Sequence, residues 1–172
     1  MYKRILVTLD RSEASEAILR EIEHMVSDGA PEVVLLTVAE VPEAAAEAPH
    51  PLVVGGAPVP GGVTRVPPPR VAEDKGQALE RIREELTDYL AEKAVILKHL
   101  GCQVQTEIGF GDPAEEILAA AKAHQVDLIA MATHGRTGLA QVIFGSVAAR
   151  VLGSSVRPVL VVRPDRLEGS PK

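Results

Sequence analysis

One stretch of the chain decides its fold: residues 126–152 have the sequence VDLIAMATHGRTGLAQVIFGSVAARVL. Asp127–Met131 is short and apolar, which predicts a buried strand. The glycine-rich residues 135–145 come next, and a helical pattern from Ser146 to Leu152 ends at Gly153. A strand that leads through such a turn into a helix can hold a phosphate, because backbone N–H groups approach it and the helix N-terminus is positive. A glycine-rich turn alone is weak evidence for this, because it is more often only a tight connection.

The same alternation of strand and helix continues on both sides of this stretch. Apolar runs predict four further strands, over Lys3–Leu9, Glu32–Ala39, Gln103–Ile108 and Pro158–Arg163. Helical spacing predicts helices after Ser12, over residues 76–100 and after Asp112, and the apolar face of the long one includes Ile96 and Leu100. Short links between alternating elements give parallel strands with helices on both faces, a doubly wound α/β fold. Such sheets bind ligands beyond the carboxyl ends of their strands, where the strand order reverses.

The length of 172 residues predicts a single domain over residues 1–165, followed by a tail of residues 166–172. Residues 42–74 interrupt the alternation, because eight of the 13 prolines lie between residues 42 and 69 and four glycines accompany them. Proline removes hydrogen-bond donors, and glycine raises the entropic cost of ordering the chain. We expect a long surface insertion there, which is either a lid over the site or a disordered linker.

Composition and charge narrow the function. The chain has 18 Lys and Arg against 24 Asp and Glu, a net charge of −6, and only four aromatic residues. A negative chain with few aromatic rings is not expected to bind nucleic acid or an anionic membrane surface. No apolar run approaches the about 20 residues of a membrane span, and we expect no signal peptide. The single cysteine, Cys102, lies in an apolar run, so we expect a buried thiol and a cytoplasmic protein.

Several segments resemble the universal stress protein family. The family motif is Gly-x-x-Gly, nine residues, then Gly and Ser or Thr, and it resembles Ala132-Thr-His-Gly135 followed by Gly145-Ser146. The likeness extends over MYKRILVTLDRSE (residues 1–13), GDPAEEIL (residues 111–118) and PVLVV (residues 158–162), and so covers the chain outside the insertion. The resemblance implies a Rossmann-like, five-stranded parallel sheet with strand order 3-2-1-4-5.

The ATP-binding branch of this family implies a nucleotide site. Asp10 matches the acidic residue beside ribose and adenine, and the backbone of Val38 matches the position that contacts adenine. The resemblance also implies a phosphate site in the glycine motif for ATP, or for AMP or ADP, with Mg²⁺ held through the phosphates. The full set of candidate site residues is Leu9, Asp10, Val38, Met131, Ala132, His134, Gly135, Arg136, Gly138, Gly145, Ser146 and Val147.

Ala132 departs from the family motif, which has glycine at this position. Its methyl group either crowds the nucleotide or, if the backbone needs a positive φ there, strains the turn. On either ground we expect Ala132→Gly to tighten ATP binding.

Three other sequence patterns, for dinucleotide binding, metal binding and catalysis, give little support to those functions. GFGDPA (residues 109–114) fits a dinucleotide fingerprint, but its acidic partner Asp127 would begin its strand, at the wrong edge of the sheet. The five histidines lack metal-ligand spacing, and His24, His99 and His124 lie near predicted helix ends. No Ser/His/Asp set and no pair of carboxylates converges on the predicted site, so we expect no catalysis, or at most slow ATP hydrolysis.

Two functions remain open at this point. One is an ATP-binding stress-response regulatory protein that acts as a nucleotide-dependent switch or binding module for an unidentified protein partner. The other is a dimeric interaction protein from the branch of the family that binds no nucleotide. For both, the apolar last strand, Pro158–Val162, lies at a sheet edge in the family order and predicts a homodimer through this strand.

Overall fold

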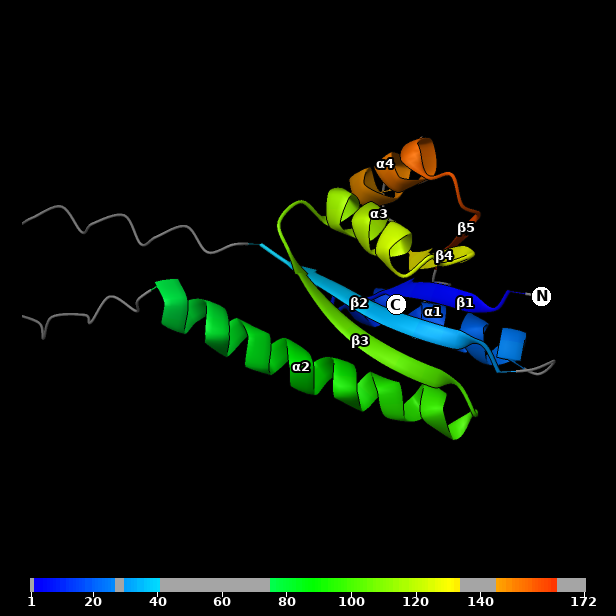
Figure 1. Ribbon diagram of the computed structural model, residues 1–172, viewed down its shortest axis with the longest axis horizontal. Helices are drawn as coiled ribbons and strands as arrows, with labels where there is room; N and C mark the ends of the chain where they lie inside the picture. Colours follow the sequence, from blue (N-terminus) through cyan, green and yellow to red (C-terminus); the bar gives the residue numbers. More distant parts are fainter. Residues whose placement is uncertain (1, 27–29, 41–74, 134–144, 164–172) are drawn as a thin grey trace, which may run out of the picture.

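The strands form one parallel sheet in the order β3-β2-β1-β4-β5 (Figure 1). The computed structural model describes residues 2–26, 30–40, 75–133 and 145–163. Within these residues the strands are β1 (Arg4–Thr8), β2 (Glu32–Ala39), β3 (Gln103–Phe110), β4 (Leu128–Ala132) and β5 (Val159–Val162). The helices are α1 (Glu13–Val26), α2 (Lys75–His99), α3 (Pro113–Ala123) and α4 (Ser146–Ser154). The expected doubly wound fold and the strand order implied by the resemblance are both confirmed.

Helices cover both faces of the sheet (Figure 1). α1 and α2 pack on one face, where their buried side chains meet Ile5, Val33 and other strand residues. α3 and α4 pack on the opposite face against Leu6, Val34 and Ile129. Because successive residues of a strand point to opposite faces, the continuous apolar runs of the central strands fill two cores at once.

The ends of the helices follow from local residues that the sequence singles out. Ser12 Oγ accepts a hydrogen bond from the Ser15 N–H at 2.9 Å, in front of α1. Asp112 accepts one from the Glu115 N–H at 3.0 Å, and Pro113 takes the first position of α3, where no N–H is needed. Gly101 follows α2 with a φ of 87°, a conformation that glycine adopts at little cost.

Two details of the sequence prediction are wrong. α4 continues to Ser154 and includes Gly153, which was expected to end it, and the C-terminal cap is Ser155. Ile96 and Leu100 do not belong to the packed face of α2, because they are 38% and 39% exposed. The buried row of α2 is Leu86, Leu90, Ala94 and Leu97. Its steps of four, four and three residues follow the helical repeat, and Ile96 and Leu100 lie on a neighbouring row.

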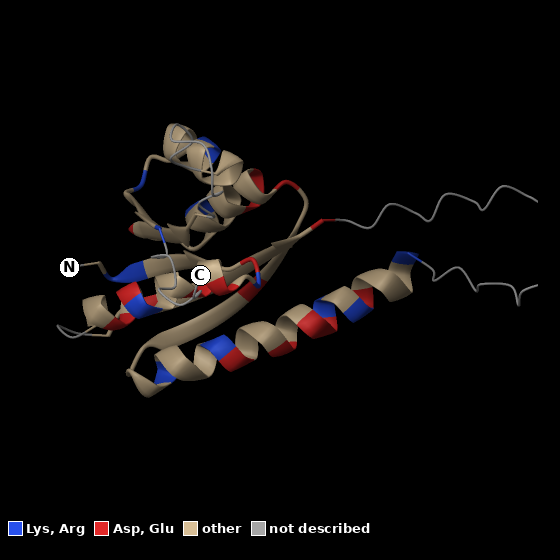
Figure 2. Ribbon diagram, turned by 180° about the vertical axis from the view of Figure 1, so that it is seen from behind, with Lys and Arg blue, Asp and Glu red and all other residues tan. Residues whose placement is uncertain are grey.

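Acidic and basic residues are interspersed along α2 (Figure 2). Arg81 and Glu85, one helical turn apart, form an ion pair at 3.0 Å. None of the helices in the described ranges combines the length and the apolar character that a membrane span requires. Cys102 is buried as expected, and its burial raises the pKa of the thiol. The predicted insertion (residues 42–74) and tail (residues 166–172) lie outside the described residues.

Candidate functional site

At its carboxyl end, β1 stops before the strands on either side of it. Its register with β2 ends at Thr8 opposite Leu36, whereas β2 continues to Ala39. Its register with β4 ends at Val7 opposite Ala130, and β4 continues to Ala132. The backbone therefore has a notch at the end of β1, between β2 and β4. The strand order reverses here, which is where the sequence places a ligand.

Backbone groups point into this notch from both sides. In a parallel strand, alternate residues direct their N–H and C=O groups toward the same neighbouring strand. The Leu36 carbonyl accepts a hydrogen bond from the Leu9 N–H at 2.9 Å, so Val38, two residues later, also faces the side of β1. The Thr133 N–H donates to β5, so Ala132, one residue earlier, faces the opposite way, toward β1. Val38 and Ala132, both among the predicted site residues, lie beyond the last pairs with β1.

Short-range hydrogen bonds fix the turn that leads from β1 into α1. Asp10 Oδ1 accepts from the Ser12 N–H at 3.1 Å and from the Ser12 hydroxyl at 2.6 Å. The Ser15 hydroxyl accepts from the Asp10 N–H at 3.2 Å and donates to the Ser12 carbonyl at 2.9 Å. The exposed Asp10 carboxylate is thereby held beside the notch, where it can accept hydrogen bonds from hydroxyl groups of a ligand.

Arg11 adopts a left-handed backbone conformation within this turn, with a φ of 66°. Such a conformation costs a non-glycine residue about 1 kcal/mol, and strain of this kind is concentrated at functional sites. The bonds of Asp10, Ser12 and Ser15 hold the turn in this shape. Sequence reasoning missed Arg11, because no pattern distinguishes it from an ordinary surface charge.

The N-terminus of α4 lies at the same edge of the sheet, because α4 returns from the carboxyl end of β4 to the start of β5. Gly145 is its N-cap and makes no side-chain capping bond, Ser146 is exposed, and the first turn has no acidic residue. The first N–H groups of this helix are suited to an anion. A Cβ added at Gly145 would meet no described atom within 4 Å, so the described fold does not require glycine there.

The structure brings five predicted site residues to the carboxyl edge: Asp10, Val38, Ala132, Gly145 and Ser146. Leu9 and Met131 are only 2% and 4% exposed, so their side chains belong to the two cores and only their backbones can contact a ligand. Val147 packs half-buried against the core beneath α3 and α4. The remaining predicted residues, His134, Gly135, Arg136 and Gly138, lie outside the described part of the chain.

One of the two expectations for Ala132 is wrong. Among the described residues other than glycine, a positive φ occurs at Arg11 and Gln125. Ala132 is an ordinary strand residue that pairs with Val162 of β5. The backbone strain is therefore in the turn after β1. The backbone of Ala132, beside the notch, is an unstrained strand.

A polar cluster links the first turn of α1 to α2 beside the notch. The Tyr89 hydroxyl donates to Glu16 Oε1 at 3.2 Å, and Lys93 Nζ pairs with the same oxygen at 3.0 Å. Burial raises the pKa of Tyr89 above its ordinary value, and the Glu16 carboxylate raises it further. Burial acts to lower the pKa of Lys93, but the hydrogen bonds to Glu16 and Glu92 outweigh it and the pKa is raised.

A second ion pair connects α4 to the start of α3. Arg150 Nη1 lies 2.6 Å from Asp112 Oδ2, and Arg150 Nη2 lies 3.7 Å from Glu115. The hydrogen bond from Arg150 holds the pKa of Asp112 below its usual range, and the Glu115 N–H acts in the same direction. This ion pair links α4, whose N-terminus borders the site, to the start of α3.

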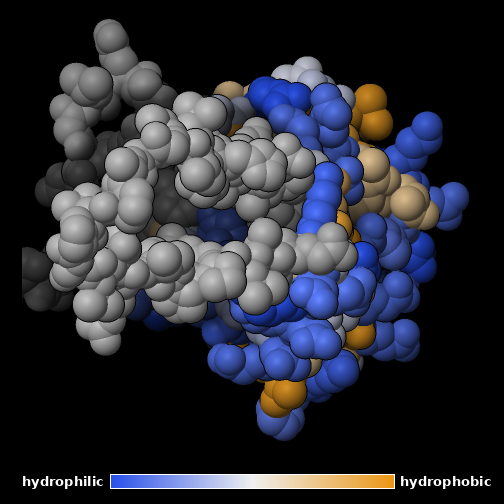
Figure 3. Space-filling view, turned by 90° about the vertical axis from the view of Figure 1, so that its left-hand side faces the viewer, coloured by the Kyte–Doolittle hydropathy of each residue, from blue (hydrophilic) through white to orange (hydrophobic). Residues whose placement is uncertain are grey.

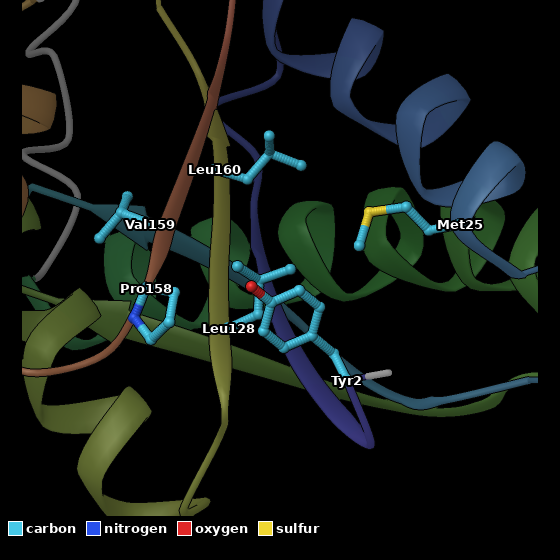
Figure 4. A pocket seen from close by; sticks show the side chains of 6 residues that line it. All are labelled: Tyr2, Met25, Leu128, Pro158, Val159 and Leu160. Atoms are coloured by element: carbon cyan, nitrogen blue, oxygen red, sulfur yellow. The ribbon is translucent and has the colours of Figure 1, made fainter.

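A pocket of about 200 Å³ opens at the opposite edge of the sheet, near the amino ends of β4 and β5. The ring of Tyr2 lies beside Leu128, and Met25 extends from α1 on the other side (Figure 4). Its lining is apolar apart from the Tyr2 hydroxyl. Where it is visible from the side of the carboxyl edge, the described surface, in contrast, is mostly hydrophilic (Figure 3). The pocket is therefore separate from the candidate site.

Comparisons with known proteins identify the family of this chain. The sequence model of the universal stress protein family matches residues 60–163. Over 163 residues, the chain is 32% identical to universal stress protein MJ0577 of Methanocaldococcus jannaschii, which covers 95% of this chain and 96% of that protein. The chain belongs to the universal stress protein family. The resemblance carried by the sequence motifs is confirmed.

Solved structures of universal stress proteins share this fold. The structure of hypothetical protein MJ0577 matches with a TM-score of 0.71 at 30% identity, covering 96% of this chain and 98% of that one. A universal stress protein in complex with cAMP matches with a TM-score of 0.60 at 17% identity, covering 94% and 97% of the two chains. One from Archaeoglobus fulgidus in complex with dAMP has a TM-score of 0.55 at 17% identity, covering 94% and 98%. At 17% identity the likeness concerns the fold alone.

Proposed function

We propose that this universal stress protein binds an adenine nucleotide, ATP in particular, in the notch at the end of β1. It then acts as a nucleotide-dependent regulatory module in a stress response. One observation carries the proposal: the backbones of Val38 and Ala132 point into the notch from both sides, beside the fixed carboxylate of Asp10. The cAMP and dAMP bound to two proteins of the same fold support it, since both contain adenine.

The residues at the notch fit the parts of an adenine nucleotide. The edge of a purine carries donors and acceptors that backbone N–H and C=O groups such as those of Val38 can match. Ribose hydroxyls can donate to the Asp10 carboxylate, and a phosphate suits the N-terminus of α4 at Gly145 and Ser146. Mg²⁺ would be held by the phosphates, because among the described residues no three His, Cys, Asp or Glu side chains gather as metal ligands.

The first test is to identify what the purified protein carries. Mass spectrometry of the supernatant after denaturation is expected to detect an adenine nucleotide. If none is found, titration calorimetry with Mg·ATP decides between the two functions, because the alternative, an interaction protein without nucleotide, releases no binding heat. Absence of binding at millimolar ATP would overturn the proposal.

Gly145→Val tests the phosphate position. A Cβ there meets no described atom within 4 Å, so the fold is expected to be retained while the backbone approach to phosphate is blocked. Gly153→Val is the matched control, because Gly153 lies on the same helix and a Cβ there also meets nothing within 4 Å. We expect calorimetry to show weaker ATP binding for Gly145→Val only. Equal affinity in all three proteins would contradict the phosphate assignment.

We further propose that the protein is a homodimer through β5 and that it is cytoplasmic. β5 is the outer strand of the sheet, and all four of its residues are apolar and only half-buried. Nearby, Val156 is 95% exposed. Unpaired backbone groups and apolar side chains on one edge favour pairing with a second copy. The single buried cysteine supports the proposed compartment, in which thiols stay reduced.

A further inference from the structure

The charged side chains at the carboxyl edge are mostly acidic. In the described strand ends and the turns that follow them, they are Asp10, Arg11, Glu40, Asp112 and Arg163. Asp112 is already paired with Arg150. Arg163 follows the outer strand β5 and has an interaction of its own. Arg11 is thus the described cation next to the notch.

Both the backbone conformation and the neighbouring helix terminus are unfavourable for Arg11. Its φ of 66° is unfavourable for a side chain of this kind. It also precedes the N-terminus of α1, whose partial positive charge attracts anions and repels cations. Arg4, Arg81 and Arg150 each pair with a carboxylate, but Arg11 forms no ion pair with a described residue. A cation kept under these conditions beside a ligand site is suited to an anion that comes from outside the chain.

The described N-terminus of α4 offers no side-chain positive charge to a phosphate chain. It offers N–H groups and the Ser146 hydroxyl, but its first turn contains no basic side chain. Each phosphate beyond the first adds negative charge that these neutral donors leave uncompensated. A guanidinium group can compensate it and donate two hydrogen bonds to phosphate oxygens at once.

We propose that Arg11 pairs with the phosphate chain of the bound nucleotide and makes the site prefer nucleoside di- and triphosphates over monophosphates. This inference rests on the proposed nucleotide binding and names the ligand class of the same site. Arg11 acts here as a specificity residue, while Val38 and Asp10 contact the nucleoside part.

Arg11→Asn tests the role, because asparagine tolerates a positive φ and carries no charge. Calorimetric titrations with ATP, AMP and adenosine at low salt are compared with those of the wild type. We expect ATP affinity to fall roughly tenfold, AMP affinity to fall less and adenosine affinity to stay the same. Arg11→Lys, which keeps the charge but not the fork of donors, should lose less ATP affinity. The ATP difference between wild type and Arg11→Asn should shrink at about 0.5 M NaCl because salt screens charge pairs.

Arg20→Gln is the matched control, since it removes an exposed charge from the same helix away from the notch. It should leave all three affinities unchanged, and thermal unfolding should show all variants folded. An unchanged ratio of ATP to adenosine affinity in Arg11→Asn would overturn the role of Arg11 and leave nucleotide binding in place. A parallel loss of adenosine binding would overturn it too, by showing that Arg11 acts through the shape of the turn. If the wild type binds none of the three compounds, the proposed function fails and this inference fails with it.

Discussion

Because the backbone of Ala132 is unstrained, a substitution at this position tests only the effect of its methyl group. Its conformation is that of a strand residue, it pairs with Val162, and it packs against the core beneath α1. Replacing it by glycine relieves no backbone strain, because none is present. Any effect on ligand binding must come from the space that the methyl group occupies.

Ala132→Gly is therefore expected to destabilise the protein by about 1 kcal/mol, because glycine in a strand loses more conformational entropy on folding. Urea denaturation followed by circular dichroism would show a lower midpoint with an unchanged slope. A higher midpoint would contradict the strand assignment. If the variant binds ATP more tightly, the gain reports crowding of the nucleotide by the methyl group.

At the scale of elements, the contact between α1 and α2 depends on a few polar groups. Tyr89 of α2 donates its hydroxyl proton to Glu16 of α1, and the Lys93 ammonium lies 5.3 Å from the centre of the Tyr89 ring. Both helices cover the same face of the sheet, and the first turn of α1 follows the turn that carries Asp10 and Arg11. The position of that turn is thus tied to α2.

The titration of Tyr89 tests this contact. The raised pKa means that the neutral, hydrogen-bonded phenol stabilises the folded state fully below about pH 10, the ordinary value, and that this stabilisation is lost as pH rises through the folded-state pKa. Ultraviolet absorbance should show one phenolate forming well above pH 10. Tyr89→Phe should remove that step, and Tyr2→Phe, the control at the other tyrosine of the chain, should retain it. Loss of the step in Tyr2→Phe would refute the assignment.

The predictability of the site differs between elements and their junctions. β2 and the start of α3 follow from an apolar run and from the Asp112 cap, both of which are local signals. Alternation of strands and helices also places Asp10 and Ala132 at one edge. The notch itself depends on where β1 ends relative to β2 and β4, and this register arises from pairing between distant segments. The left-handed turn at Arg11 arises from side-chain hydrogen bonds that no periodic pattern reveals.

At the scale of the whole molecule, the two edges of the sheet differ in character. β3 presents exposed polar residues such as Gln103, Gln105 and Thr106, which oppose pairing with another sheet. β5 is apolar throughout. Association is therefore expected at one edge only, which gives a closed pair of protomers instead of an extended assembly.

Leu160→Lys tests the assembly. Light scattering at tens of micromolar protein should give twice the 18.2 kDa chain mass for the wild type and a single chain mass for the variant, because the lysine places a charge in the paired edge. Val95→Lys is the control, since Val95 is an exposed apolar residue on α2, far from β5 in the sheet order. A monomeric wild type, or a monomeric Val95→Lys protein, would refute the proposed interface.

The central position of β1 has a consequence for how the protein matures during translation. β1 is made before the other strands of the sheet, but one of its two neighbours, β4, is made only after β2 and β3, and the Arg4 N–H bonds to Asp127 across 123 residues of sequence. A nascent chain that has emerged as far as β3 contains Asp10 and Val38 but not Ala132 or α4. A ligand that needs both halves stabilises only the finished fold. Under the proposed function, nucleotide would therefore stabilise only chains in which β4 and α4 are in place. It would not assist the slow, long-range pairing of β1 with β4 that comes before binding.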